Sequence, residues 1–211
     1  MKKYILFDND GVLVHTEPLY FKANIKALKE YFDVELEFKE YMKIMSEGTT
    51  VWQKAFDKGF SQKEIKKARN QRNIYYQEYL KNENILISGV KEVLNELSKN
   101  YKMGIVTTSR RVDFEIIHKD LGIVDFMDFV LCEEDYNHAK PHPEPYLTGL
   151  KIFGAEKDET IVVEDSTRGL TAAFKAGIEC VIVKNEFTIT QDFSKASYFI
   201  DTLSELKTIL N

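Results

Sequence analysis

The chain has 211 residues, of which 44% are hydrophobic, 30% are charged and four are proline. This composition is typical of a globular protein and excludes collagen-like, coiled-coil and intrinsically disordered classes. The formal net charge of -5 gives no general attraction to nucleic acid or to an anionic membrane, so we expect neither as a partner. The length fits one core domain that carries an insertion.

Strand and helix signals alternate along most of the sequence, which predicts βαβ units and a mainly parallel sheet. The predicted strands lie at residues 4–7, 103–107, 129–132, 160–164, 180–183 and 198–200. Two of the predicted helices, 111–121 and 167–176, are followed by Gly122 and Gly177, which we expect to be their C-terminal caps. The predicted fold class is therefore α/β, with a Rossmann-like parallel sheet as its core.

Residues 16–87 interrupt this alternation, because they contain successive amphipathic helices and no convincing strand. We expect them to form an all-helical domain, inserted into a core domain of residues 1–15 and 88–211. Ser61 and Glu64 have the spacing of a capping box at the start of a long helix. Its basic residues are expected on a solvated face: Lys66, Lys67, Arg69 and Arg72.

No stretch approaches the roughly 18 consecutive apolar residues of a membrane-spanning helix. The apolar run after Lys3 is broken by Asp8 before it reaches the length of a signal peptide, so a cytoplasmic location is expected. Cys132 and Cys180 fall in predicted apolar strands, where unpaired buried cysteines are common, so both are expected to be structural.

The run FDNDGV, residues 7–12, places two aspartates at the end of the first predicted strand. Because side chains alternate along an extended strand, Asp8 and Asp10 point roughly the same way, and their carboxylates repel unless a cation or a shared proton intervenes. The same residues also form a turn signature. The pair therefore indicates either a metal or acid/base site, or a turn without a catalytic role.

Further polar residues lie where other predicted strands end, at the sheet edge where parallel α/β proteins bind ligands. They are Thr107, Thr108, Lys140, Glu164 and Asp165. Carboxylates from Asp8 and Asp165, with a backbone carbonyl, suit Mg²⁺, and a hydroxyl and an ammonium group can donate to phosphate oxygens. The composition of the site indicates phosphate chemistry, and the lack of a Gly-rich P-loop disfavours a nucleoside triphosphatase of that class.

Four segments resemble, in order, the four motifs of the haloacid dehalogenase superfamily. FDNDGVLV resembles the first motif, Thr107 stands at the Ser/Thr position of the second, KPHPEPY resembles the third, and VVEDSTRGLTAA resembles the fourth. The insertion 16–87 then corresponds to the helical cap domain of subfamily IA, which contains phosphatases and β-phosphoglucomutase-like phosphomutases. The resemblance spans residues 4–184 and implies an enzyme that hydrolyses phosphoric monoesters.

The resemblance also implies a role for each matching residue. Asp8 would attack phosphorus and become an aspartyl phosphate, and Asp10 would act first as general acid and then as general base. Thr107, Thr108 and Lys140 would hold the transferring phosphoryl group. The Mg²⁺ ligands implied are Asp8, the main-chain carbonyl of Asp10, Asp165 and, directly or through water, Glu164.

Three other activities share parts of this site. Haloacid dehalogenation needs neither Mg²⁺ nor Asp10. A β-phosphoglucomutase-like phosphomutase needs a second anion contact in the cap, where residues 20–22 contain no histidine. A non-catalytic switch phosphorylated on aspartate would lack the long helical insertion. We therefore favour a phosphatase, monomeric or weakly dimeric, that acts on a small phosphorylated metabolite of the sugar phosphate or phosphoglycolate type.

The cap is expected to decide which substrate is bound, because the core recognises only phosphate. The candidate leaving-group contacts form a polar turn between cap helices: Glu47, Gly48, Thr49 and Thr50. Arg110 is a candidate contact for a substrate anion or a surface charge, and His15 is a candidate substrate contact or a partly solvated hinge residue.

Overall fold

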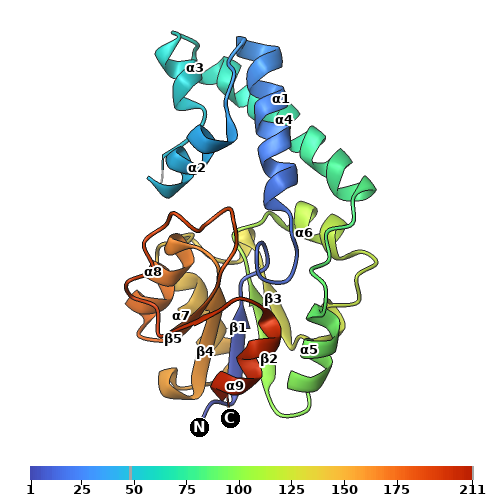
Figure 1. The fold of residues 1–211 in the computed structure, drawn as a ribbon, viewed down its shortest axis with the longest axis vertical. Helices are drawn as coiled ribbons and strands as arrows, with labels where there is room; N and C mark the ends of the chain where they lie inside the picture. Colours follow the sequence, from blue (N-terminus) through green and yellow to red (C-terminus); the bar gives the residue numbers. More distant parts are fainter. Residues whose placement is uncertain (48, 211) are drawn as a thin grey trace. The chain divides into compact units, whose positions relative to one another are not determined.

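The computed structural model describes residues 1–47 and 49–210. The chain divides into two compact units, both drawn in Figure 1. The first unit contains Met1–His15 and Ile85–Asn211, and the second contains Thr16–Asn84. The second unit is therefore an insertion into the chain of the first.

A parallel sheet forms the centre of the first unit. Among the described residues its strands are β1 (Tyr4–Phe7), β2 (Lys102–Val106), β3 (Phe129–Leu131), β4 (Thr160–Glu164), β5 (Glu179–Val183) and β6 (Tyr198–Ile200). Neighbouring strands are parallel throughout, in the order β3-β2-β1-β4-β5-β6. β4 is buried at every position, as expected for a strand covered on both faces. The predicted α/β class with a Rossmann-like sheet is confirmed.

Helices cover both faces of this sheet. They are α5 (Val90–Leu97), α6 (Arg111–His118), α7 (Glu144–Phe153), α8 (Thr167–Ala176) and the short C-terminal α9 (Leu206–Leu210). α7 and α8 pack against each other and against the sheet, on the side opposite to α5 (Figure 1). The chain connects β1, β2 and β3 through α5 and α6, and β3, β4 and β5 through α7 and α8.

The helix ends test the predicted glycine caps. Gly177 has a φ of 75° and caps α8, so this prediction is confirmed. The prediction for Gly122 is wrong, because α6 ends at His118 and Lys119 is its C-cap. The chain then turns, with the N–H of Leu121 donating to the carbonyl of His118, and Gly122 follows with a φ of 61°.

An apolar cluster lies between the sheet and α7/α8, and it includes one tyrosine. Leu6, Val162 and Leu170 are buried there together with Tyr146, which is 0% exposed. Cys132 and Cys180 are both buried and unpaired, as predicted. No described helix is both long enough and apolar enough to cross a membrane.

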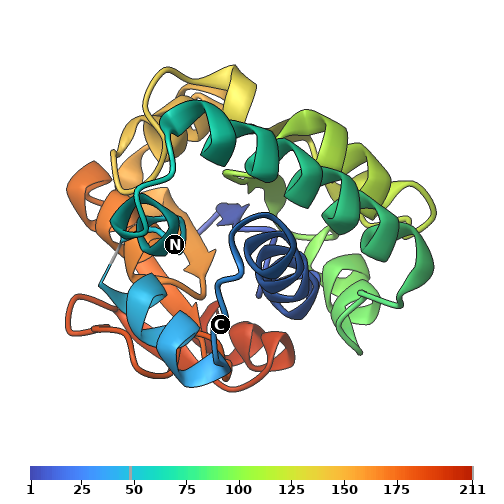
Figure 2. The same cartoon turned by 90° about the horizontal axis from the view of Figure 1, so that it is seen from above.

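The second unit is helical throughout its described secondary structure. It contains α1 (Glu17–Phe32), α2 (Phe38–Ser46), α3 (Gln53–Asp57) and α4 (Gln62–Asn82). α1 and α4 pack against each other, and Figure 2 shows both from above. The predicted capping box is present: the N–H of Ser61 donates to Glu64 at 2.9 Å, and the N–H of Glu64 donates back to the Ser61 hydroxyl at 3.4 Å.

One member of the basic run on α4 is buried, which corrects the expectation of a solvated face. Arg72 is 6% exposed, its guanidinium lies 4.3 Å from the centre of the Tyr20 ring, and it donates to Asn24 at 3.3 Å. Arg72 shares a helix face with Ile65 and Ala68, both buried, at i+7 and i+4 spacing. The remaining members are exposed: Lys66, Lys67 and Arg69.

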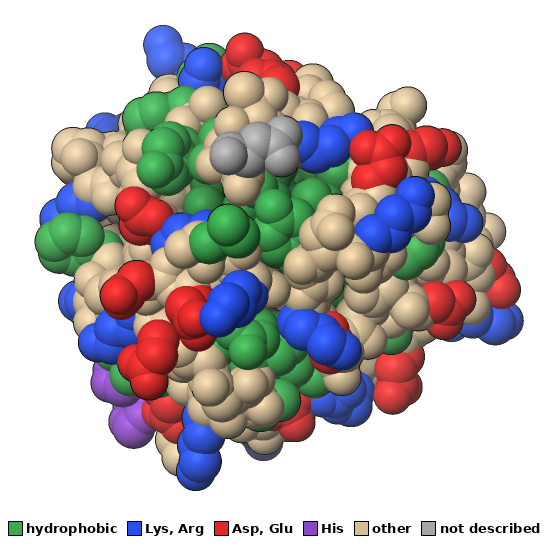
Figure 3. Space-filling model, turned by 90° about the horizontal axis from the view of Figure 1, so that it is seen from below, with side chains coloured by type: hydrophobic (Ala, Val, Ile, Leu, Met, Phe, Trp, Pro, Cys, Tyr) green, Lys and Arg blue, Asp and Glu red, His purple; other side chains and the backbone are tan. Residues whose placement is uncertain are grey.

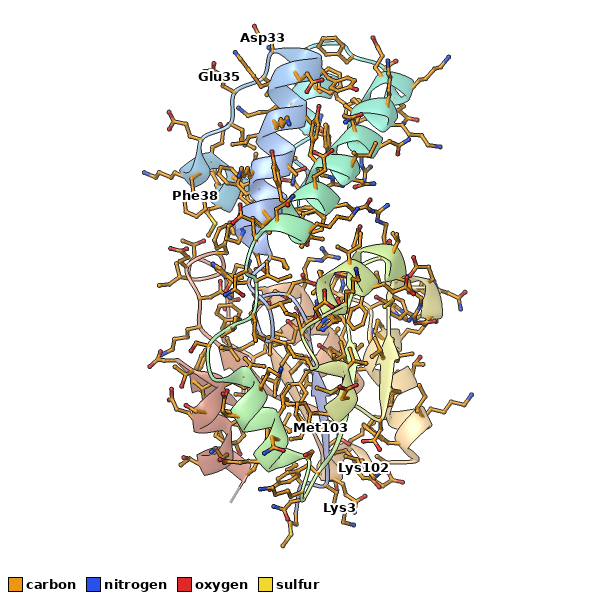
Figure 4. All side chains as sticks on the ribbon, turned by 90° about the vertical axis from the view of Figure 1, so that its right-hand side faces the viewer. Lys3, Asp33, Glu35, Phe38, Lys102 and Met103 are labelled. Atoms are coloured by element: carbon orange, nitrogen blue, oxygen red, sulfur yellow. The ribbon has the colours of Figure 1, made fainter. Side chains whose placement is uncertain are left out.

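The N-terminal ends of β1 and β2 carry ion pairs at the surface. Lys3 and Lys102, labelled in Figure 4, pair with Glu159 at 2.5 Å and with Asp128 at 2.7 Å. Figure 3 views the protein from this side, and Lys and Arg side chains are interspersed there with Asp and Glu side chains. The labelled lysines at this edge are thus already neutralised by neighbouring carboxylates.

Candidate active site

The opposite edge of the sheet gathers the polar residues that the sequence singled out. β1 is in register with both β2 and β4, so the residues that follow these strands meet at one place. Asp8 follows β1, Thr107 follows β2, and Asp165 follows β4. Asp8 also continues the ladder, since its N–H donates to the carbonyl of Val163 at 2.8 Å.

Lys140 forms the centre of the site. Its ammonium group donates to Asp8 Oδ1 at 2.6 Å, to Glu164 Oε1 at 2.6 Å and to the carbonyl of Val106 at 2.9 Å. These acceptors engage all three of its N–H groups. Burial alone would lower the pKa of Lys140, but the two carboxylates raise it above its ordinary value, so the side chain stays charged. Arg168 fixes the same segment by donating to the Lys140 carbonyl at 2.8 Å.

Glu164 is fully buried and orients Lys140. Its Oε1 also accepts from the Tyr146 hydroxyl at 2.7 Å, and its Oε2 accepts from the N–H of Asp165 and from the N–H and hydroxyl of Ser166. Burial would raise the pKa of Glu164, but the contact with Lys140 holds it below its ordinary value. Glu164 lies against the first turn of α8, where only glycine leaves room: a Cβ on Gly169 would be 1.6 Å from Oε1.

Three buried carboxylates at this edge can hold a cation. Asp8, Glu164 and Asp165 each place an oxygen within 4.8 Å of the other two, and Lys140 supplies one compensating charge. Burial raises the pKa of Asp8 to about 7 despite Lys140, and a divalent cation would lower it. Asp165 Oδ2 accepts from the Asn185 amide at 2.9 Å, which orients that carboxylate. Hard oxygen ligands with excess negative charge fit Mg²⁺.

Three hydrogen bonds converge on Asp10 Oδ2. This oxygen accepts from the Ser109 hydroxyl at 2.7 Å, from Asn9 Nδ2 at 3.3 Å and from the Thr107 hydroxyl at 3.4 Å. Thr107 is 1% exposed, and its carbonyl accepts from the Tyr136 hydroxyl at 2.7 Å. These contacts bring the aspartate after β1 and the threonine after β2 into one hydrogen-bonded group.

Asn9, which contacts Asp10, also forms a hydrogen bond with His118. Asn9, which is 0% exposed, places its Oδ1 2.7 Å from His118 Nε2 on α6. Burial lowers the pKa of His118 to about 4, so its imidazole is neutral at physiological pH. Its ring also stacks on Phe114, with the ring centres 4.2 Å apart.

Other predicted site residues of the first unit have different surroundings. The guanidinium of Arg110 forms a bidentate ion pair with the Asp113 carboxylate, with N–O distances of 2.6 and 2.9 Å. His15 is exposed, and its ring packs edge-on against Phe187 at 6.1 Å. Thr108 is half-buried beside Thr107. The structure thus gives Arg110 a carboxylate partner outside the Asp8 cluster, while the proposed substrate roles of these three residues stay predictions.

The candidate leaving-group contacts belong to the second unit. Glu47 is the C-cap of α2, and the Thr49 N–H and hydroxyl both donate to the Ile44 carbonyl at 3.2 Å. Thr50 accepts from the N–H of Trp52 at 3.4 Å, and Gly48 lies outside the described residues. Their predicted role in substrate binding stays a prediction.

Sequence reasoning missed several residues that organise this site. They are Asn9, Ser109, His118, Tyr146 and Asn185. Asn185 could have been found, because it follows β5 at the same sheet edge. Ser109 lies two residues after Thr107 in the same segment. His118 and Tyr146 lie within amphipathic helices, where their spacing matches that of core residues and gives no separate signal.

The fold and the site together define a parallel α/β protein with a buried lysine–carboxylate centre that fits Mg²⁺. A family model described as haloacid dehalogenase-like hydrolase matches residues 5–183. The chain therefore belongs to the haloacid dehalogenase-like hydrolases. The predicted family and the predicted class of enzyme, a hydrolase of this family, are confirmed.

Relatives match along almost the whole chain. Pyrophosphatase PpaX of Bacillus mycoides is 28% identical over 215 residues, which cover 98% of this chain and 96% of the relative. A crystal structure described as a predicted phosphoglycolate phosphatase from Haemophilus somnus superposes with a TM-score of 0.86 at 25% identity and covers 100% of this chain and 98% of its own. CbbY of Rhodobacter sphaeroides, in complex with phosphate, has a TM-score of 0.81 at 22% identity, covering 98% of this chain and 96% of its own.

Proposed function

We propose that the chain is a Mg²⁺-dependent phosphatase that hydrolyses a small phosphorylated metabolite through an aspartyl phosphate on Asp8. The observation that carries this proposal is the contact of Lys140 with Asp8, which lies beside Asp165 and interacts electrostatically with Asp10. A carboxylate nucleophile, an acid/base group two residues away and oxygen ligands for a cation are the parts that phosphoryl transfer to an aspartate requires.

In the first proposed step, an oxygen of Asp8 attacks phosphorus, and the bond from phosphorus to the leaving oxygen breaks. Asp10 donates a proton to that leaving oxygen. In the second step a water attacks the phosphorus of the aspartyl phosphate, gives a proton to Asp10 and releases Asp8 as a carboxylate. Phosphate and the dephosphorylated product leave, and both aspartates return to their starting states.

The surrounding residues support these steps through charge and orientation. Lys140 favours the ionised form of Asp8, and its positive charge offsets the negative charge of the incoming phosphoryl group. The Thr107 hydroxyl and its neighbour Thr108 are proposed donors to phosphoryl oxygens. Mg²⁺, when bound by Asp8, Asp165 and the Asp10 carbonyl, supplies further positive charge for the phosphoryl oxygens. Glu164, whose two oxygens accept hydrogen bonds from Lys140, Tyr146 and the start of α8, is proposed mainly to orient Lys140.

The relatives guide the choice of substrates for testing. Their names include a pyrophosphatase and a predicted phosphoglycolate phosphatase, so the panel should contain sugar phosphates, phosphoglycolate and inorganic pyrophosphate. Continuous phosphate release supports a hydrolase. Conversion to an isomeric phosphate ester without phosphate release would support a phosphomutase, and transfer of a single phosphoryl group per chain would support a switch.

Removal of divalent cations is expected to abolish phosphate release, and added Mg²⁺ is expected to restore it. Asn185→Ala is expected to raise the Mg²⁺ concentration for half-maximal release on the order of tenfold, because Asp165 loses the amide that orients it. Release measured against Mg²⁺ concentration after chelation checks both results. Full activity in excess chelator would contradict the metal requirement, and an unchanged half-saturation in the variant would contradict the role of Asn185.

A further inference from the structure

The contacts of Asp10 determine which way the Asn9 amide faces. Asp10 Oδ2 accepts hydrogen bonds whether Asp10 is ionised or carries its proton on the other oxygen, so the group of Asn9 that lies 3.3 Å from Oδ2 is the NH₂ group. The carbonyl oxygen of the same amide therefore faces His118 Nε2 at 2.7 Å. Since that oxygen can only accept, Nε2 of His118 carries the hydrogen.

The environment of His118 fits this tautomer. With the hydrogen on Nε2, the neutral ring has no hydrogen on Nδ1, and Nδ1 is buried with no hydrogen-bond partner among the described residues. A buried N–H without an acceptor would cost more than a bare ring nitrogen, so the opposite tautomer and the charged ring are both disfavoured. The lowered pKa of His118 agrees with a neutral donor at physiological pH.

We propose that His118 is a positioning residue for the acid/base group: it fixes the Asn9 amide, and Asn9 in turn holds Asp10 by Oδ2. This inference rests on the proposed function in giving Asp10 the acid/base role. Asn9 is 0% exposed and His118 is 8% exposed, so bulk water cannot readily replace either partner. Without the imidazole, the amide can rotate and present its carbonyl oxygen to the carboxylate, which repels it.

Two variants separate the hydrogen bond from the packing of the ring. His118→Phe keeps an aromatic ring against Phe114 but removes the donor, whereas His118→Gln can place an amide N–H close to the position of Nε2. We expect kcat to fall about tenfold in His118→Phe with KM little changed, because a misplaced acid/base group slows chemistry rather than binding. His118→Gln is expected to recover most of the loss. Equal losses in both variants, or no loss in His118→Phe, would overturn the proposal.

A double-mutant cycle tests whether the two residues act as a unit. Asn9→Leu removes the link while keeping a side chain of similar shape, and we expect it to lower kcat about as much as His118→Phe. The double variant Asn9→Leu/His118→Phe is then expected to be no slower than either single variant. Multiplicative losses would show that His118 acts by another route and would overturn the proposal.

A readout that does not depend on activity separates this proposal from the proposed function. The Asn9 side-chain amide, assigned in ¹H–¹⁵N spectra by its loss in Asn9→Leu, is expected to exchange slowly with solvent in the wild type and in His118→Gln. In His118→Phe its signals should shift and exchange faster. If the wild type released no phosphate from any substrate, the proposed function would fail, while this measurement would still decide the orientation of Asn9. Unchanged amide signals in His118→Phe would overturn the proposal that His118 fixes the Asn9 amide.

Discussion

Replacement of Asp8 by asparagine is expected to lower phosphate release on the order of 10³-fold or more, with little change in the fold. An amide is a far weaker nucleophile than a carboxylate, and the variant cannot form the aspartyl phosphate. The amide oxygen can still accept the hydrogen bond that Lys140 donates at 2.6 Å. Loss of one of three crowded buried carboxylates also removes repulsion with Glu164, so the free energy of unfolding should not fall appreciably.

The measurement compares phosphate release by wild type, Asp8→Asn and a matched control on the same substrate at saturating Mg²⁺. Asp158→Asn is the control, because Asp158 is an exposed aspartate of the same unit and lies before the N-terminal end of β4, at the opposite edge of the sheet from Asp8. Thermal unfolding followed by circular dichroism shows whether each variant is folded. A folded Asp8→Asn protein that retains more than about a tenth of the activity would remove Asp8 from the nucleophile role.

The fold followed from the sequence because strand and helix periods alternate, and because buried parallel strands are nearly continuous apolar runs. The same logic placed Asp8, Thr107 and Asp165 together, since the ends of parallel strands share one edge. Single-residue signals for helix ends and for solvent exposure on helices were less reliable. Gly122 looked like a cap, yet α6 ends earlier at His118. Arg72 was predicted to be solvated because it belongs to a run of basic residues. Its i, i+3, i+7 spacing with Ile65 and Ala68, which indicates a buried position, was not taken into account.

Contacts between distant side chains could not be predicted from single-sequence patterns. His118 and Asn9 are 109 positions apart in the chain, and nothing in the local sequence of either residue indicates their hydrogen bond. The burial of Glu164 could not be inferred from the local sequence either. At the end of β4 and next to Asp165, Glu164 resembled part of a solvated acidic pair, whereas its contacts with Tyr146 and with the start of α8 depend on how two helices pack.

Gly169→Ala is expected to destabilise the protein by about 3 kcal/mol, although alanine is the better residue in most helices by about 1 kcal/mol. The added Cβ would lie 1.6 Å from Glu164 Oε1 and 1.8 Å from its Cδ, so the carboxylate must move. Movement breaks the hydrogen bonds with Lys140 and Tyr146 and leaves buried polar groups unpaired, which costs several kcal/mol on its own. For a chain of this size the expected fall in Tm is about 6–12 °C.

Urea unfolding of Gly169→Ala, Glu164→Ala and the double variant tests whether the collision with Glu164 causes the loss of stability. Without the Glu164 side chain, the alanine at 169 meets no carboxylate, and its helix propensity should make the double variant as stable as Glu164→Ala or more stable by up to about 1 kcal/mol. Additive losses in the double variant would contradict the collision and would place the effect of Gly169 elsewhere in the first turn of α8. A strong positive coupling would show that this glycine exists to admit Glu164, and through it to hold Lys140 against Asp8.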